Sequence, residues 1–156
     1  MLEVKDYKPE DSESVRNLIL SILKDEYPFD MNAYSETDIN DITGVYSGEK
    51  NTFFVIKDKG KVIGTLGVKN ESNKTALLRR FFVDKAYRKR GLGAGLVKKA
   101  VSFCESKGYK EIAFRATDRM KDAMRLLEKN GFKKIESLEV SGFHIHKYLL
   151  TLETQG

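Results

Sequence analysis

The chain has little cysteine, little proline and no long apolar run, and these absences exclude several classes of protein. Cys104 is the only cysteine among 156 residues, so no disulfide can form within the chain. No apolar run approaches the ~18 residues that a membrane-spanning helix needs. The N-terminal segment MLEVKDYKPED lacks the apolar core of a signal peptide. We therefore expect a cytoplasmic protein, kept in a reducing environment, with no membrane partner.

Cys104 itself falls on an apolar helical stripe. It is in phase with Leu96, Ala100 and Phe103. This spacing is typical of a buried structural thiol and not of a nucleophile.

Positive and negative charges are segregated along the chain. The formal net charge is +5, and residues 74–100 carry nine Lys and Arg but one acid, Asp84. Residues 25–41 carry six acids and no base. A basic surface permits a polyanionic partner, but the basic run has no recognised nucleic-acid motif and no interleaved exposed aromatics. We therefore expect no nucleic-acid partner, and we expect at least one of the two segments to face a ligand.

Hydrophobic periodicity and turn residues predict the element order β-α-α-β-β-β-α-β-α-β-β. Residues 15–23 have the spacing of an amphipathic helix, and Ser35 with Asp38 resembles a capping box that opens a second helix ending at Gly48. Further helices are predicted from the glycine-rich segment to Gly108 and from Met120 to Gly131, and strands over 2–5, 52–57, 62–69, 75–84, 111–115, 132–140 and 143–152. We predict a single α/β domain, residues 1–156, with helices covering a mixed sheet.

The segment YRKRGLGAGLVKKA, residues 87–100, places glycines where a helix should begin. Glycine inside a helix costs about 1 kcal/mol relative to alanine, so this start indicates that a ligand approaches the backbone closely. Leu96 stands where a dinucleotide-binding turn needs its third glycine, and the Gly-Lys-Ser/Thr of a Walker A loop is absent. The unpaired N–H groups and the partial positive charge of a first helical turn favour a diphosphate beside Arg88-x-x-Gly91-x-Gly93.

Two motifs of the chain, together with the spacing between them, resemble those of the GNAT superfamily of N-acetyltransferases. RKRGLG matches the acetyl-CoA motif of that family, and MKDAMRLLEKNGF is similar to its second motif helix. The resemblance spans nearly the whole chain. It implies a mixed, mostly antiparallel central sheet of about seven strands flanked by about four helices. It also implies acetyl-CoA as co-substrate, and it allows a homodimer.

The resemblance also implies roles for individual residues. Phe82 and Val83 would offer main-chain groups to the pantetheine arm, where two neighbouring strands part. The residues that would wrap the pyrophosphate, mostly through backbone amides, are Arg88, Lys89, Arg90, Gly91, Leu92, Gly93 and Ala94.

The usual general acid of the family is missing from this chain. Leu127 stands where the family has a tyrosine, and it also completes the apolar stripe of its helix. An alkylamine with a pKa near 10.4 is mostly protonated at pH 7, so a base is expected. His146 and Tyr148 share a strand face and are the candidate base and substitute acid, against the alternative that they are merely packed or exposed. No third ligand accompanies His144 and His146, so we expect no metal.

The acidic segment is the candidate acceptor side. Tyr27, Asp38 and Asp41 are predicted to contact the acceptor, and the six acids predict a cationic primary amine. The expected reaction is direct attack of that amine on the thioester of acetyl-CoA. A non-catalytic acyl-CoA-binding module remains the alternative, because the usual acid is missing at Leu127.

Overall fold

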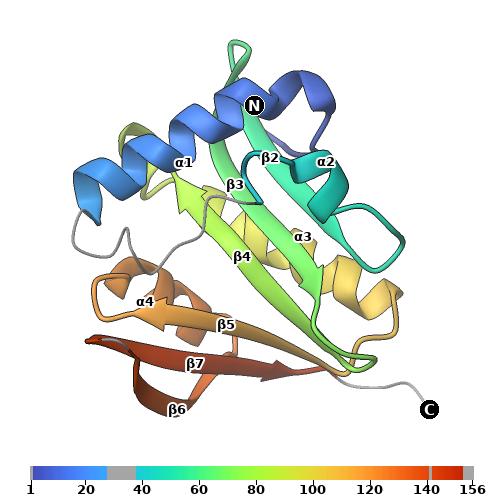
Figure 1. The fold of residues 1–156 in the computed structure, drawn as a ribbon, viewed down its shortest axis with the longest axis vertical. Coiled ribbons are helices and arrows are strands. Elements are labelled where there is room, and N and C mark those ends of the chain that lie inside the picture. The colour runs from blue at the N-terminus through green and yellow to red at the C-terminus, as the bar shows by residue number, and fades with distance from the viewer. Residues whose placement is uncertain (1, 28–37, 141, 153–156) are drawn as a thin grey trace.

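The computed structural model describes residues 2–27, 38–140 and 142–152, which form one mixed sheet with helices on both faces (Figure 1). The strands are β1 (Val4–Asp6), β2 (Thr52–Asp58), β3 (Lys61–Asn70), β4 (Thr75–Val83), β5 (Glu111–Thr117), β6 (Lys133–Val140) and β7 (Phe143–Thr151). The α-helices are α1 (Ser12–Glu26), α2 (Ile42–Val45), α3 (Leu92–Ser106) and α4 (Lys121–Lys129). This order confirms the predicted one.

The sheet is antiparallel except at one place. Its strand order is β1-β2-β3-β4-β5-β7-β6, and only β4 and β5 run parallel. In Figure 1, α1 and α2 lie in front of β2, β3 and β4, and α3 lies behind them. The seven-stranded, mostly antiparallel sheet with four helices in the described ranges confirms the expected fold class.

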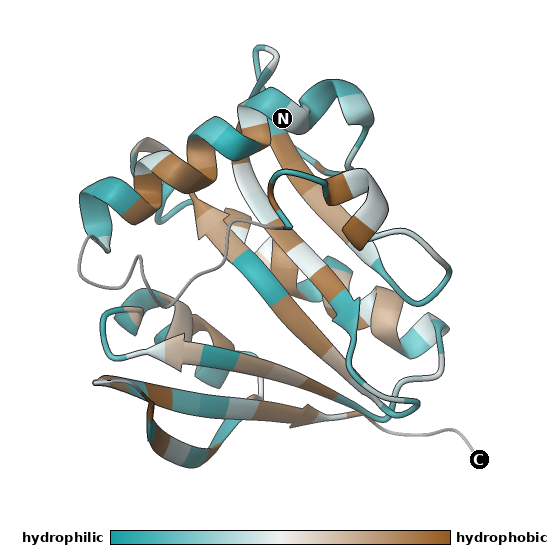
Figure 2. Cartoon of the chain, viewed as in Figure 1, coloured by the Kyte–Doolittle hydropathy of each residue, from teal (hydrophilic) through white to brown (hydrophobic). Residues whose placement is uncertain are grey.

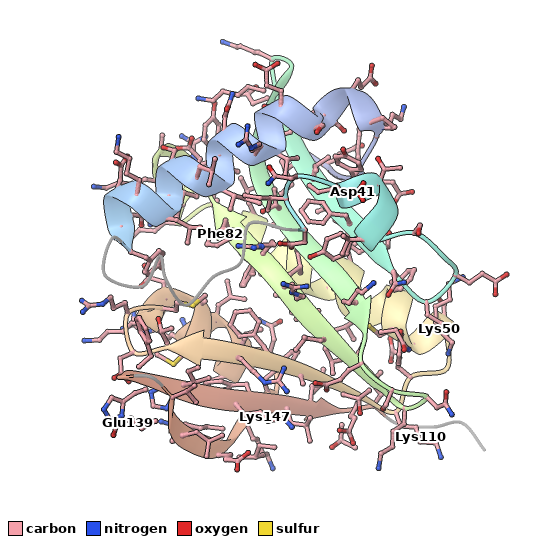
Figure 3. The ribbon with its side chains drawn as sticks, in the orientation of Figure 1. Asp41, Lys50, Phe82, Lys110, Glu139 and Lys147 are labelled. Carbon is pink, nitrogen blue, oxygen red and sulfur yellow. The ribbon has the colours of Figure 1, made fainter. Side chains whose placement is uncertain are left out.

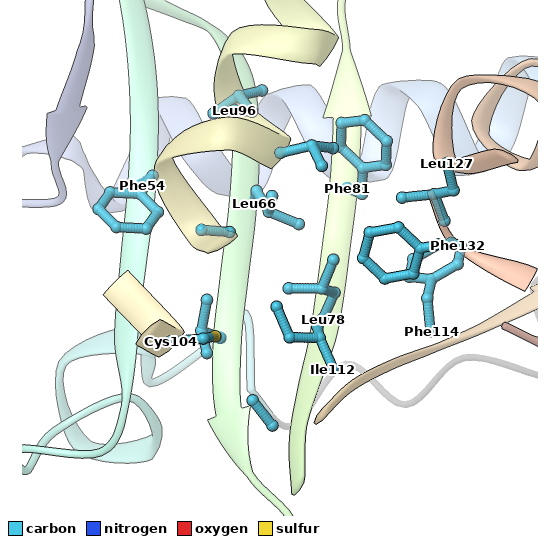
Figure 4. Packing of buried hydrophobic residues seen from close by; sticks show 14 of the residues in the cluster. Phe54, Leu66, Leu78, Phe81, Leu96, Cys104, Ile112, Phe114, Leu127 and Phe132 are labelled. Carbon is cyan, nitrogen blue, oxygen red and sulfur yellow. The ribbon is translucent and has the colours of Figure 1, made fainter. Parts of the chain in front are cut away.

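Two hydrophobic clusters fill the two faces of the sheet. One packs α1 and α2 against β2 and β3, and the other packs α3 and α4 against β3, β4, β5 and β7. Figure 2 shows the apolar bands along the central strands, and Figure 4 shows the second cluster from close by.

Cys104 lies in the cluster under α3 and α4 with no exposed surface, and burial raises the pKa of its thiol to about 12. The thiol is therefore protonated at neutral pH, as expected for a structural cysteine.

The second helix differs from its prediction. It begins at Ile42, and Asp41 caps it by accepting a hydrogen bond from the Gly44 N–H at 3.1 Å. Ser35 lies outside the described residues, and Asp38 is engaged elsewhere, as described below. Ile42 and Tyr46 are nevertheless buried, as the pattern indicated, because packing on the sheet selects the apolar positions whatever the helix length.

No helix in the described ranges is long and apolar enough to span a membrane.

Candidate active site

The parallel strands β4 and β5 part halfway along their length. Their ladder pairs Thr75 with Glu111 and ends at Leu78 with Phe114. Beyond that pair β4 continues to Val83 and β5 to Thr117, and the two strands diverge (Figure 1). Backbone N–H and C=O groups that lose a ladder partner need another one. The gap between the strands is therefore suited to a ligand with amide groups of its own.

A β-bulge in β4 lies at this parting. Thr65 pairs with Phe82 and Gly67 with Arg79, so two residues of β4 lie opposite one residue of β3. Arg80, one of the two, has a φ of 54°, in the left-handed region. The Thr65 hydroxyl donates to the Arg80 carbonyl at 2.8 Å, which helps to hold this conformation.

A buried ion pair fixes the side chain of the bulge. Arg80 donates from Nε and Nη2 to the Asp38 carboxylate, with a shortest distance of 2.6 Å, and both side chains are 4% exposed. The Tyr46 hydroxyl donates to the same carboxylate at 2.8 Å. Burial would raise the pKa of Asp38, but its hydrogen bonds and the Arg80 charge outweigh it, and the pKa lies below its usual value. Asp38 is therefore ionised and positions the bulge.

Two double variants test whether the backbone at position 80 is strained. Asp38→Asn with Arg80→Gly removes the ion pair and places glycine, which adopts positive φ freely, at position 80. Asp38→Asn with Arg80→Ala removes the same pair and places alanine there, at a cost of about 1–2 kcal/mol. We expect the glycine version to be more stable by about this amount in urea unfolding. Equal stabilities would show that the backbone strain at Arg80 is unimportant.

One pocket, of about 320 Å³, extends from the parted strand β4 to the glycine-rich turn. Seven of the nine predicted cofactor residues line it, whereas Arg90 and Ala94 do not: the seven are Phe82, Val83, Arg88, Lys89, Gly91, Leu92 and Gly93. The sequence analysis missed two lining residues of the β4 side, Phe81 and Tyr87, and the lining residues that α4 supplies, which are Asp122, Ala123, Arg125 and Leu126. Leu126 lies beside the apolar stripe that the helix periodicity marked, so a wider helical face could have found it.

The glycines of the turn have separate structural reasons. Gly91 is the N-cap of α3 and has a φ of 79°, which side chains rarely adopt. A Cβ on Gly93 would lie 3.0 Å from Leu126 Cδ1 and 3.5 Å from Phe81 Cζ. Gly93 thus leaves open the space between two walls of the pocket. The first N–H groups of α3 have no acceptor within the helix, so an anion can bind them.

Arg88 is used differently from the expectation. Its Nη1 and Nη2 donate to both oxygens of Glu26, at 2.6 and 2.7 Å, and its Nε donates to the Val83 carbonyl at 2.9 Å. The guanidinium therefore ties the end of α1 to the end of β4 at the pocket mouth. Around a diphosphate, this leaves the backbone amides as the principal donors of the turn.

The predicted base and acid lie on the α4 side of the sheet, outside the pocket lining. His146 Nε2 contacts Asp118 Oδ1, and its Nδ1 lies 2.8 Å from the Ser137 hydroxyl. Tyr148 is 1% exposed and donates to Glu128 Oε1 at 2.9 Å, and burial with this bond raises its pKa to about 12. The arrangement gives no support to catalytic roles for these two residues. Leu127 is fully buried, in agreement with its interpretation as core.

The three predicted acceptor residues are not brought together. Tyr27 lines the pocket at the end of α1, whereas Asp41 caps α2 and Asp38 holds Arg80 (Figure 3 labels Asp41 and Phe82). The acidic segment therefore does not present these carboxylates as a free acidic wall, because Asp38 and Asp41 satisfy groups of the protein itself. Glu26, another of its acids, is bound to Arg88.

A sequence profile of the acetyltransferase (GNAT) family matches residues 15–132, which is more than half of the chain. The chain belongs to the GNAT acetyltransferase family. Among relatives, the "Probable N-acetyltransferase camello" of Xenopus tropicalis is 29% identical over 71% of this chain and 52% of that protein. The chain thus spans about half the length of the curated relatives that it matches.

Solved structures share the fold along the whole chain. An acetyltransferase of the GNAT family from Staphylococcus aureus Mu50 has a TM-score of 0.87 at 22% identity, covering 98% of this chain and all of that one. A GNAT family acetyltransferase from Elizabethkingia anophelis, solved with acetyl-CoA bound, has a TM-score of 0.69 at 15% identity, covering 97% of this chain and 98% of that one. At these identities the likeness concerns the fold alone.

Proposed function

We propose that this GNAT chain transfers an acetyl group from acetyl-CoA to a primary amine. The observation that carries the proposal is the pocket that joins the parted strand β4 to the turn at Gly91. The turn offers helix N–H groups for a diphosphate. Beyond Leu78, the edge of β4 that no longer pairs with β5 offers main-chain groups for the pantetheine amides. The apolar walls at Phe81 and Leu126 suit the rest of that arm.

The proposed reaction is a direct transfer. The neutral amine nitrogen attacks the thioester carbonyl carbon and forms a tetrahedral intermediate. When this intermediate collapses, the carbon–sulfur bond breaks and the proton lost from the nitrogen passes through solvent to the departing thiolate, so the products are the amide and the free thiol of CoA. Holding both reactants in one site lowers the barrier, because the entropy of bringing them together is lost on binding and not in the reaction step. A main-chain N–H of β4 near Phe82 or Val83 is the proposed donor to the carbonyl oxygen as negative charge develops on it.

Two further expectations stay predictions: that the enzyme uses no metal, and that it forms a homodimer. In the described ranges, no cluster of three or more His, Cys, Asp or Glu side chains has the arrangement of a metal site.

Calorimetric titration with acetyl-CoA tests the assignment of the pocket. We expect one molecule to bind per chain, with CoA competing, because the two share the diphosphate and the pantetheine arm. Failure of both to bind would remove the proposal. Binding without turnover of any amine would instead favour the alternative, a non-catalytic acyl-CoA-binding module.

A further inference from the structure

Three basic side chains form a row across neighbouring strands where β4 and β5 part. Arg79 on β4 and Arg115 on β5 each follow the last paired residues of the ladder, Leu78 and Phe114. Lys147 on β7 is the register partner of Arg115. Hydrophilic bands cross all three strands in Figure 2, and Figure 3 labels Lys147.

The row lies on the face of the sheet that carries α1. Leu78 and Phe114 belong to the cluster under α3 and α4, and side chains alternate along a strand, so Arg79 and Arg115 point to the opposite face. Register partners share a face, so Lys147 points the same way. The pocket reaches β4 at Phe81, which is in the bulge, and at Phe82, the next residue. The row therefore adjoins the end of the pocket that is farther from the glycine-rich turn, where the acetyl group would lie.

Two side chains of the row lie opposite each other as a like-charge pair. Like charges placed directly opposite each other on neighbouring strands destabilise a sheet, and Arg115 stands opposite Lys147. Arg79 is 3.9 Å from an Asp38 oxygen, but that carboxylate is already bound by Arg80.

Two further acids lie near the row. Glu71 accepts from Arg115 at 2.9 Å, and Glu136 on β6 is the register partner of Lys147. Lys147 forms no salt bridge with the part of the chain that the structure describes. The side chains of Arg79 and Arg115 remain 33% and 45% exposed, so a small molecule can reach them.

We propose that this row binds an anionic group of the acceptor, and that the acceptor is a primary amine bearing a carboxylate, such as an amino acid. Guanidinium groups bind carboxylates through two parallel hydrogen bonds, which orient the molecule as well as attract it. The inference rests on the proposed acetyl transfer and specifies its second substrate. It differs from the expected cationic acceptor. In the acidic segment, Glu26, Asp38 and Asp41 are bound to other groups of the protein, and Asp30 and Glu36 lie outside the described residues.

The acceptor class is tested by steady-state kinetics with matched amines. Release of the CoA thiol would be followed with amino acids, with the amines that lack only their carboxylate, and with spermidine. We expect the carboxylate-bearing member of each pair to have a kcat/KM higher by about tenfold or more, which corresponds to one charge-assisted hydrogen bond. A panel in which no carboxylate-bearing amine is acetylated would overturn the proposal, whatever the other amines do.

Single variants test the residues of the row. Arg115→Gln and Arg79→Gln are each expected to raise the KM of the amino acid about 10–100-fold and to leave the KM of acetyl-CoA unchanged. Glu71→Gln should lower the KM of the amino acid, because it releases Arg115. Arg16→Gln, an exposed charge on α1, is the matched control and should change neither constant.

Thermal unfolding separates this role from a structural one. Arg115→Gln removes both the like-charge contact with Lys147 and the ion pair with Glu71, so we expect the two effects to offset each other and leave the Tm nearly unchanged while the KM rises. A lower Tm with an unchanged KM would mean that Arg115 only supports the fold, and the inference would fail. If the unsubstituted protein does not bind acetyl-CoA, the proposed function itself is wrong.

Discussion

Gly93→Glu is expected to abolish acetyl-CoA binding. A Cβ at this position would lie 3.0 Å from Leu126 and 3.5 Å from Phe81, which belong to two walls of the pocket. The longer side chain would extend into the space between them and would bring a negative charge to the proposed diphosphate site. Charge-assisted hydrogen bonds contribute about 1.5–3 kcal/mol each, so losing two of them weakens binding at least about 100-fold. Calorimetric titration of both proteins measures the change.

Gly95→Ala is the matched control for this variant. Gly95 lies two residues further along α3, and a Cβ there would meet only Val4, at an ordinary contact distance of 3.9 Å. Alanine there should leave the affinity unchanged and stabilise the helix by up to about 1 kcal/mol. Circular dichroism shows whether the glutamate variant is folded. A folded Gly93→Glu protein with unchanged affinity would disprove the assignment of this turn.

Leu127→Ala is expected to destabilise the protein by about 2–5 kcal/mol without a specific effect on turnover. Leu127 is fully buried, and Figure 4 shows it beside Phe114 and Phe132 in the cluster under α4. Truncating it leaves a cavity in a packed region, and its side chain has no group that exchanges protons. Urea unfolding gives the loss of stability, and the rate per folded molecule gives the effect on activity.

Leu138→Ala provides the comparison at an exposed leucine. Leu138 is 51% exposed on β6, so its truncation should change the free energy of unfolding by no more than about 0.5 kcal/mol. If Leu127→Ala lost turnover at a temperature where it is fully folded, Leu127 would shape the catalytic site and the account of proton transfer would need revision.

The sequence was sufficient for the fold and for seven of the residues that line the pocket. Local signals specify both: alternating or helical apolar spacing gives the elements, and the turn at Gly91 and Gly93 has the composition that a backbone anion site requires. The α4 wall of the pocket was missed because Leu126 looks like any other apolar residue of an amphipathic helix.

The acceptor side could not be read from the sequence because it depends on pairings between distant segments. Asp38 lies 42 positions from Arg80, and nothing local indicates that the two form a buried ion pair. Glu26 and Arg88 are 62 positions apart. Charge counted along the chain therefore predicted an acidic wall, whereas the fold uses two of those acids, Glu26 and Asp38, to neutralise its own arginines. Likewise, the row of Arg79, Arg115 and Lys147 exists only once β4, β5 and β7 are neighbours.

The most direct test of the account is to follow an isotope-labelled acetyl group by mass spectrometry. The protein would be incubated with labelled acetyl-CoA and a broad set of amines, and amides and free CoA would both be quantified. We predict that the label appears in an amine product, with one CoA released for each amide formed. Tight binding of acetyl-CoA with no labelled amide from any amine would contradict catalysis and leave only a binding module.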